Sequence, residues 1–96
     1  MATLRRLVLD VLKPHDPPLL QFTERIDAVD CIDGVTASLI ELDREVENVK
    51  LTVEGEALDY EAIEEAIGGL GGTVHSVDQV AYGSFVVEER RTPQDD

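Results

Sequence analysis

Apolar and polar residues alternate along four stretches of the chain, and alternation of this kind is typical of half-buried β-strands. The four stretches are residues 4–13, 35–43, 46–54 and 73–82. In the first three, side chains of one parity are expected to face a core: Leu7, Leu9, Val11, Ile40, Leu42, Val49, Leu51 and Val53. The parity of the second stretch stays open, because Val35 also has a residue type that favours burial.

Two segments between these stretches carry apolar residues at spacings of three and four, which is typical of one face of an amphipathic helix. The two apolar stripes are Leu19, Phe22, Ile26 and Val29, and Ile63, Ala66, Ile67 and Leu70. Asp16 is expected to cap the first helix, with Pro17 at its first position, and Asp59 to cap the second. The glycines of "GGLGG" (68–72) predict the end of the second helix and a tight turn.

The predicted order of elements is βαββαβ, two similar halves joined by a hairpin near residues 43–47. Right-handed crossovers then put both helices on one face of a four-stranded antiparallel sheet. The predicted fold class is α+β, a ferredoxin-like βαββαβ sandwich. We expect residues 1–84 to form this single domain and residues 85–96 to form a flexible acidic tail.

The sheet face without helices is expected to be open, and the pattern predicts which side chains lie on it. They are Arg6, Val8, Asp10 and Leu12, then Ala37, Leu39, Glu41 and Asp43, then Asn48, Lys50, Thr52 and Glu54. Asp10 stands in the middle of an otherwise apolar strand, directly beside the strand that carries Lys50. A carboxylate at this position needs either a polar partner or a function.

Three interpretations of the Asp10 carboxylate are open. In the first, Asp10 and Lys50 form a cross-strand ion pair, worth about 0.2–1 kcal/mol. In the second, apolar residues of the open face form a subunit interface, and the Asp10–Lys50 pair fixes its register. The residues of this predicted interface are Val8, Asp10, Leu12, Ala37, Leu39 and Lys50. In the third, Asp10 is an oxygen ligand of a metal ion.

The charge of the chain narrows the classes of partner. Twenty-one acidic and eight basic residues give a net charge of −13 over 96 residues, and such a surface repels nucleic-acid phosphates. An acidic surface poor in lysine resembles those of salt-loving archaeal proteins, in which molar salt screens the self-repulsion. The alternative is an acidic surface fitted to a basic partner.

Cysteine content and hydropathy indicate the cellular setting. Cys31 is the single cysteine, which excludes a disulfide within the chain. Asp10 and Lys13 interrupt the apolar run near the N-terminus, which argues against a signal peptide or a membrane span. A cytoplasmic protein without a membrane partner is therefore expected.

Acidic residues are concentrated at the predicted hairpin. Glu41, Asp43, Glu45 and Glu47 alternate in "ELDREVEN" (41–48), so a turn can bring carboxylates together. Hard cations such as Ca²⁺ bind oxygen ligands of this kind. The alternative is a solvated charged face, which is the commoner role of a charge run.

The two histidines are the other candidates for ligand binding. His15 follows the first strand and His75 begins the last, and we expect them near opposite ends of neighbouring strands, which argues against a shared transition-metal site. Asp78 is close enough in sequence to share a ligand site with His75. No arrangement of nucleophile, base and orienting group is apparent, and "GGLGG" precedes a strand rather than opening a helix. The chain is therefore expected not to be an enzyme.

Three segments, "LRRLVLDVLKPHDP", "IELDREVENVKLTVEG" and "GGTVHSVDQV", resemble in this order a small archaeal family known as domain of unknown function 211. The resemblance extends over roughly residues 4–83. It implies a ferredoxin-like fold, ring-like homo-oligomers and an association with calcium, with no established activity. The oxygen donors at matching positions would be Asp10, Glu41, Asp43, Glu45 and Glu47.

Together these features predict a non-enzymatic, self-assembling binding or regulatory module, a homo-oligomer whose one expected cofactor is Ca²⁺. The alternative is a regulatory domain that senses a small molecule of the amino-acid type. A heavy-metal chaperone is excluded, because the segment after the first strand reads "KPHDPP" and contains no Cys-x-x-Cys.

Overall fold

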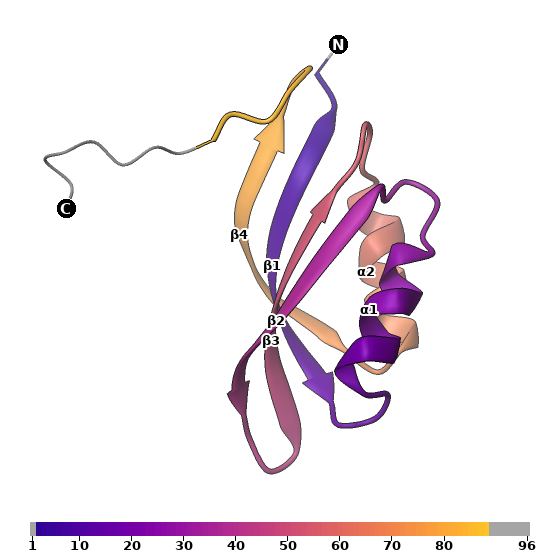
Figure 1. Ribbon diagram of the computed structural model, residues 1–96, viewed down its shortest axis with the longest axis vertical. Coiled ribbons are helices and arrows are strands. Elements are labelled where there is room, and N and C mark those ends of the chain that lie inside the picture. The colour runs from indigo at the N-terminus through magenta and orange to yellow at the C-terminus, as the bar shows by residue number, and fades with distance from the viewer. Residues whose placement is uncertain (1, 89–96) are drawn as a thin grey trace, which may run out of the picture.

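The structure is a computed structural model that describes residues 2–88. Its elements are β1 (Leu4–Pro14), α1 (Leu19–Asp27), β2 (Gly34–Leu42), β3 (Val46–Glu54), α2 (Tyr60–Gly69) and β4 (Thr73–Tyr82). The strands form one antiparallel sheet in the order β2-β3-β1-β4, and both helices cover the same face (Figure 1). The predicted ferredoxin-like fold is confirmed. Residues 89–96 of the predicted tail lie outside the described residues.

The core lies between the sheet and the helices, and the two central strands supply about half of its buried residues. Alternate residues of these strands face the helices and are buried, as the sequence pattern predicts: Leu7, Leu9 and Val11 of β1, and Val49, Leu51 and Val53 of β3. The apolar stripes of the helices pack onto them through Phe22, Ile26, Ile63 and Ile67. The hydrophobic effect thus fixes the parity of both central strands.

The start of α1 differs from the prediction. The helix begins at Leu19, its N-cap residue is Pro18, and no side chain caps it, so the predicted cap at Asp16 is wrong. A residue that precedes proline is disfavoured in helical conformation. Because Asp16 and Pro17 each precede a proline, both residues are disfavoured in helical conformation, and the helix begins after the second proline.

Both ends of α2 follow the prediction. The Asp59 carboxylate accepts a hydrogen bond from the backbone N–H of Ala62 (3.3 Å) and so caps the first turn. Just after the helix, Gly71 adopts a φ of +86°, which glycine tolerates without strain. The next N–H, that of Gly72, then donates to the carbonyl of Ile67 (2.9 Å) and closes the helix.

Up to Leu39, the edge strand β2 shows the opposite parity from the predicted one. It pairs with β3 through Val35–Val53, Ala37–Leu51 and Leu39–Val49, so the odd-numbered residues of this part lie on the helix face. The prediction that Ala37 and Leu39 lie on the open face is therefore wrong. A bulge at Ile40 then shifts the register, so that Glu41 pairs with Asn48 on the open face. Ile40 and Leu42 are exposed rather than buried, because the helices do not reach them.

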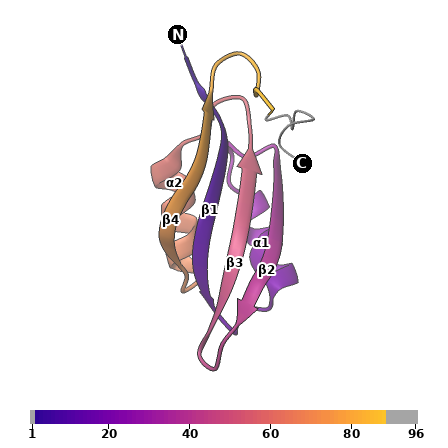
Figure 2. The same ribbon diagram turned by 90° about the vertical axis from the view of Figure 1, so that its left-hand side faces the viewer.

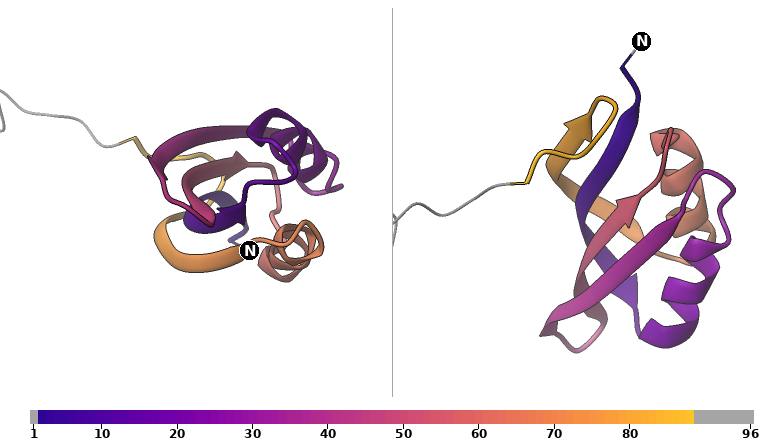
Figure 3. Two further views of the ribbon diagram at one scale, coloured as in Figure 1. Left: turned by 90° about the horizontal axis from the view of Figure 1, so that it is seen from below. Right: turned by 45° about the horizontal axis from the view of Figure 1, so that its top comes forward.

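The sheet is longer than the helices that cover it. Strands of 9 to 11 residues are about 30–37 Å long, whereas helices of 9 and 10 residues are about 14–15 Å long. The sheet is also twisted, so its uncovered parts lie at two diagonal corners: the β2–β3 hairpin, and the end of β4 beside the start of β1 (Figures 1 and 3). Apolar side chains at these corners remain in contact with water.

Candidate functional site

The polar residues singled out in the sequence gather at one end of the sheet, where β1 ends, the β2–β3 hairpin turns and β4 begins. We call this the hairpin end. The pairings Pro14–Val46 and Leu12–Thr73 bring the three segments together. Two groups of polar side chains lie there, one on the open face, which is turned to the viewer in Figure 2, and one on the helix face.

On the open face, the hairpin end contains a hollow of about 260 Å³. It is lined by Asp10, Leu12, Glu41, Asp43, Val46, Asn48 and His75. The side-chain amide of Asn48 donates a hydrogen bond to the carboxylate of Asp10 across the β1–β3 pair. The polar partner of Asp10 is therefore Asn48, its diagonal neighbour on the adjacent strand.

The predicted partner Lys50 does lie directly opposite Asp10 in the register of β1 and β3. No ion pair joins these two side chains, although the structure describes both of them. Lys50 is exposed, and Asp10 is half-buried beneath Asn48. The cross-strand ion pair is one of three interpretations of Asp10, and in the structure the Asn48 hydrogen bond takes its place.

The two histidines lie at the same end of the sheet, not at opposite ends. Because β4 runs antiparallel to β1, its first residues pair with the last residues of β1, and His75 comes to the hairpin end. The sheet nevertheless separates the two rings, since His75 lines the hollow on the open face and His15 contacts Glu47 on the other. Asp78 does not line the hollow and accepts a hydrogen bond from the hydroxyl of Ser76 (2.7 Å).

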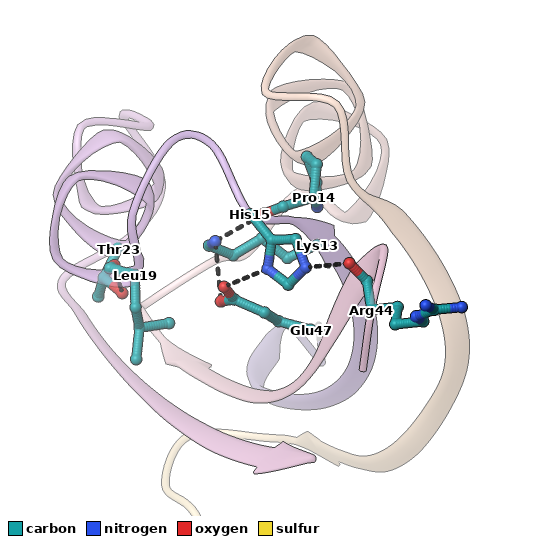
Figure 4. Close-up of polar contacts among 7 residues, drawn as sticks. All are labelled: Lys13, Pro14, His15, Leu19, Thr23, Arg44 and Glu47. Atoms are coloured by element: carbon teal, nitrogen blue, oxygen red, sulfur yellow. Dashed lines mark hydrogen bonds and ion pairs between the residues drawn. The ribbon is translucent and has the colours of Figure 1, made fainter. Parts of the chain in front are cut away.

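On the helix face, the hairpin end holds an ion cluster of Lys13, His15 and Glu47 (Figure 4). The side chain of Lys13 is fully buried; its Nζ donates to Glu47 Oε1 (3.0 Å) and to the carbonyl of Pro14 (2.7 Å). Its ammonium also lies 5.8 Å from the centroid of the Phe22 ring. Burial of this ammonium is tolerated because each contact offsets part of its lost hydration.

His15 joins the cluster to the hairpin. Its Nδ1 lies 3.0 Å from Glu47 Oε2, and its Nε2 lies 2.9 Å from the carbonyl oxygen of Arg44. Both partners are acceptors, so both ring nitrogens must donate. Only the protonated imidazolium has two donors, and the geometry therefore selects the charged form of His15.

The titration of the cluster follows from these contacts. The hydrogen bond to Glu47 and then the one to the Arg44 carbonyl raise the pKa of His15 above its ordinary value. In return, the hydrogen bonds from His15 and then from Lys13 lower the pKa of the Glu47 carboxyl. Both shifts favour the state in which the carboxylate and the imidazolium are charged.

The five carboxylates considered as calcium ligands do not form one group. Asp10, Glu41 and Asp43 line the open-face hollow, Glu45 lies in the hairpin outside it, and Glu47 belongs to the ion cluster on the other face. Their oxygens suit a hard cation chemically. Within residues 2–88, however, no three side chains of His, Cys, Asp or Glu converge closely enough to hold a metal ion. Calcium binding therefore stays a prediction without an assigned set of ligands.

The predicted interface residues do not share one face of the sheet. Val8, Leu12 and Lys50 lie on the open face, where Val8 is buried and Leu12 half-buried, whereas Leu39 lies on the helix face. The larger exposed apolar surface is at the two edge strands. In β2 the exposed side chains are Leu39 (47%), Ile40 (59%) and Leu42 (65%), and in β4 they are Val77 (46%), Val80 (54%) and Tyr82 (60%).

The sequence pattern did not lead us to expect an exposed apolar edge at β4. The feature that indicates it is the spacing of three between Val74, Val77 and Val80, which does not fit strict alternation. In the structure all three lie on the helix face, because β4 contains register shifts next to His75 and Asp78. In β4 the spacing of three thus reflects two bulges.

Two comparisons relate the chain to known proteins. The profile of the family domain of unknown function 211, described as "Uncharacterized ArCR", matches residues 5–96. An uncharacterized protein of Methanocaldococcus jannaschii is 48% identical over 95 residues, which covers 99% of this chain and 98% of that protein. Separately, no helix within residues 2–88 is long and apolar enough to cross a membrane.

Two variants at Lys13 test how much the ion cluster contributes to the free energy of unfolding. Lys13→Met keeps most of the buried stem but leaves Glu47 with His15 alone, so we expect it to lower the free energy of unfolding by about 2 kcal/mol. Lys13→Ala also removes the packing of the stem against Phe22, and a loss of about 3–4 kcal/mol is expected. Urea denaturation at pH 6 in molar salt measures both.

Lys50→Met is the matched control, because Lys50 is exposed on the open face, and its effect should stay within about 0.5 kcal/mol. Equal stability of the variants at Lys13 and Lys50 would contradict the stabilising role of the cluster.

Proposed function

The chain belongs to the domain of unknown function 211 family, and from the edges of its sheet we propose that it is a non-enzymatic binding module that assembles into ring-like homo-oligomers. The observation that carries the proposal is the pair of apolar edge strands, β2 and β4, on opposite sides of one sheet. Edge strands present unpaired backbone donors and acceptors, and natural monomers protect them with charges, prolines or a covering segment. An edge without such protection favours pairing with another chain.

Both edge strands contain bulges, which are one form of edge protection, but they carry few charges and no proline. β2 is nine residues long and its one charged residue is Glu41, while β4 is ten residues long and contains Asp78 and His75. Neither contains lysine or proline, in a chain whose net charge is −13. The scarcity of charge at these two edges therefore contrasts with the rest of the sequence and favours contact with a second copy.

The strand directions support a head-to-tail contact. β2 runs in the same direction as β1, because both are antiparallel to β3, and β4 runs in the opposite direction. When β4 of a second copy is placed beside β2 in the same orientation, the antiparallel alternation of the sheet continues. The two contacting surfaces differ, so the contact is heterologous, and repeated contacts of this kind form a ring when the rotation between copies closes.

The side chains on the helix face support the same contact. Leu39 and Leu42 of β2 and Val77 and Val80 of β4 all lie on this face, where the helices do not cover them. Without a shift along the strands, Leu39 would lie level with Val74 of the next copy. The proposed contact shifts the next copy by two residues, which brings Leu39 beside Val77 and Leu42 beside Val74. Cross-strand apolar contacts of this kind stabilise a sheet joint.

A hollow at the β4 edge offers space for these leucines. It has a volume of about 260 Å³ and is lined by Leu4, Leu7, Tyr60, Val77, Val80 and Tyr82. These side chains come from β1, the start of α2 and β4, at the corner of the sheet that the helices leave open (Figure 1). An apolar hollow at an unprotected edge is the surface expected to bury an apolar strand from another copy.

Two variants that block different edges test the proposal. Val80→Glu should block the β4 edge and Leu42→Glu the β2 edge, since each would bury an unpaired charge. Light scattering in molar potassium chloride should give a discrete oligomer for the native chain and a monomer for each variant. Mixing the two variants should give a dimer that does not grow further, because each retains the edge that the other lacks.

Val87→Glu is the matched control. Val87 is exposed but lies after β4, beside Glu88, which pairs with Arg6 on the open face (2.7 Å), so this variant should assemble like the native chain. High salt is used because repulsion between chains of charge −13 opposes assembly at low ionic strength. A monomeric native chain under these conditions, or a mixture that stays monomeric while the native chain assembles, would contradict the head-to-tail proposal.

A further inference from the structure

We propose that His15 is a proton-operated latch on the β2–β3 hairpin, and that its imidazolium holds the hairpin end of β2 in the form that assembles. The proposal rests on the assembly through β2 proposed above and adds its regulation. It predicts that mild acidification strengthens assembly and that mild alkalinity weakens it.

The hairpin has little packing of its own to fix its conformation. It projects beyond the helices at the end of the sheet, and its residues 41–45 are all exposed (Figure 1). The bulge at Ile40 separates this part of β2 from the regular ladder of Gly34–Leu39. Leu42, an assembly residue, therefore lies in the part of β2 that its own packing holds least.

His15 holds the hairpin at two points. Glu47, which contacts Nδ1, is the direct register partner of Leu42 in the β2–β3 pair. Arg44, whose carbonyl contacts Nε2, lies in the turn two residues after Leu42. The ring thus connects the segment after β1 to both sides of the turn (Figure 4).

Loss of one proton must open one of these contacts. A neutral imidazole has one donor and one acceptor, whereas Glu47 and the Arg44 carbonyl both require a donor. The nitrogen that loses its proton then faces an acceptor oxygen lone pair to lone pair. Deprotonation therefore releases either the turn or the Glu47 carboxylate.

The charged groups around His15 confine the structural change on its deprotonation to the hairpin. From β1, Lys13 approaches the same carboxylate; from β3, Glu47 contacts the ring; from the hairpin, the backbone of Asp43 and the carbonyl of Arg44 face it. Asp16 follows in its own loop, and the α1 residues drawn in Figure 4, Leu19 and Thr23, are uncharged. Because Lys13 keeps Glu47 paired, the core stays folded when His15 becomes neutral.

The direction of the pH dependence follows from the two pKa shifts. The pKa of His15 is raised, first by Glu47, so its contribution is fully present below the ordinary value of about 6.5 and is lost as pH rises through the raised value. The pKa of Glu47 is lowered, first by His15, so its contribution is present above about 4.5 and is lost as pH falls through the lowered value. The latch is closed at pH values between the lowered pKa of Glu47 and the raised pKa of His15. It opens when the pH rises above the pKa of His15.

Light scattering of the full chain in molar potassium chloride, at pH 6.0 and at pH 8.5, tests the latch. The concentration at which the native oligomer dissociates should be several-fold higher at pH 8.5 than at pH 6.0. In His15→Gln this difference should disappear, because the glutamine amide does not titrate. His75→Gln changes the chain's other histidine, on the opposite face, and should keep the native pH dependence.

The outcomes separate the latch from the assembly. A native oligomer whose dissociation does not change with pH, or a pH dependence that survives in His15→Gln, overturns the latch and leaves the assembly standing. A native chain that is monomeric at both pH values overturns the assembly instead. In that case the latch is tested on the monomer by amide exchange of residues 42–46, corrected for the intrinsic rate. Protection that falls at pH 8.5 in the native chain but not in His15→Gln supports the latch, and equal protection overturns it.

Discussion

The structure depends on a mismatch of lengths between its sheet and its helices. Two helices of about three turns each cover the middle of strands that are about twice as long. The covered part forms a dry core in which the central strands are fixed by burial on one face. The uncovered part leaves apolar side chains of β2 and β4 in water at diagonal corners. In the proposed assembly, neighbouring copies bury these corners.

At the hairpin end, which the helices do not cover, charged side chains take the place of apolar packing. Beyond the reach of the core, Lys13 is buried against Phe22 and its ammonium is paired with Glu47. His15 extends this pairing to the turn of the hairpin. A polar cluster thus orders the part of the sheet where apolar packing ends, and its one titrating member near neutral pH gives that order a dependence on protons.

Much of the fold could be predicted from the sequence, because β1, β3 and both helices carry clear apolar periodicities. The errors occur where tertiary packing overrides a local pattern. The bulge at Ile40 changes the parity of β2, and two consecutive prolines move the start of α1 past Asp16. Neither bulges nor edge exposure can be read from alternation alone, because both depend on which strand becomes the neighbour.

The candidate site was predictable only in part, for a related reason. The sequence placed Asp10, Glu41 and Asp43 on the open face, and they line one hollow there. Glu47 has the opposite parity in β3 and pairs with Lys13 and His15 instead. The predicted position of His75 is wrong because β4 runs antiparallel to β1, which places its first residues beside the last residues of β1. Asn48, an uncharged residue, was not recognised as the partner of Asp10.

Head-to-tail joining of β2 to β4 is the central claim, and cysteine cross-linking in solution tests it most directly. In a Cys31→Ser background, Leu39→Cys and Val77→Cys are combined in one chain and oxidised in molar salt. Within a chain the two edges are separated by two strands, about 14 Å, which is beyond the reach of a disulfide. The account predicts a ladder of covalent multimers for the double variant and none for either single variant. Monomers alone, in a chain that light scattering shows to be oligomeric, would contradict it.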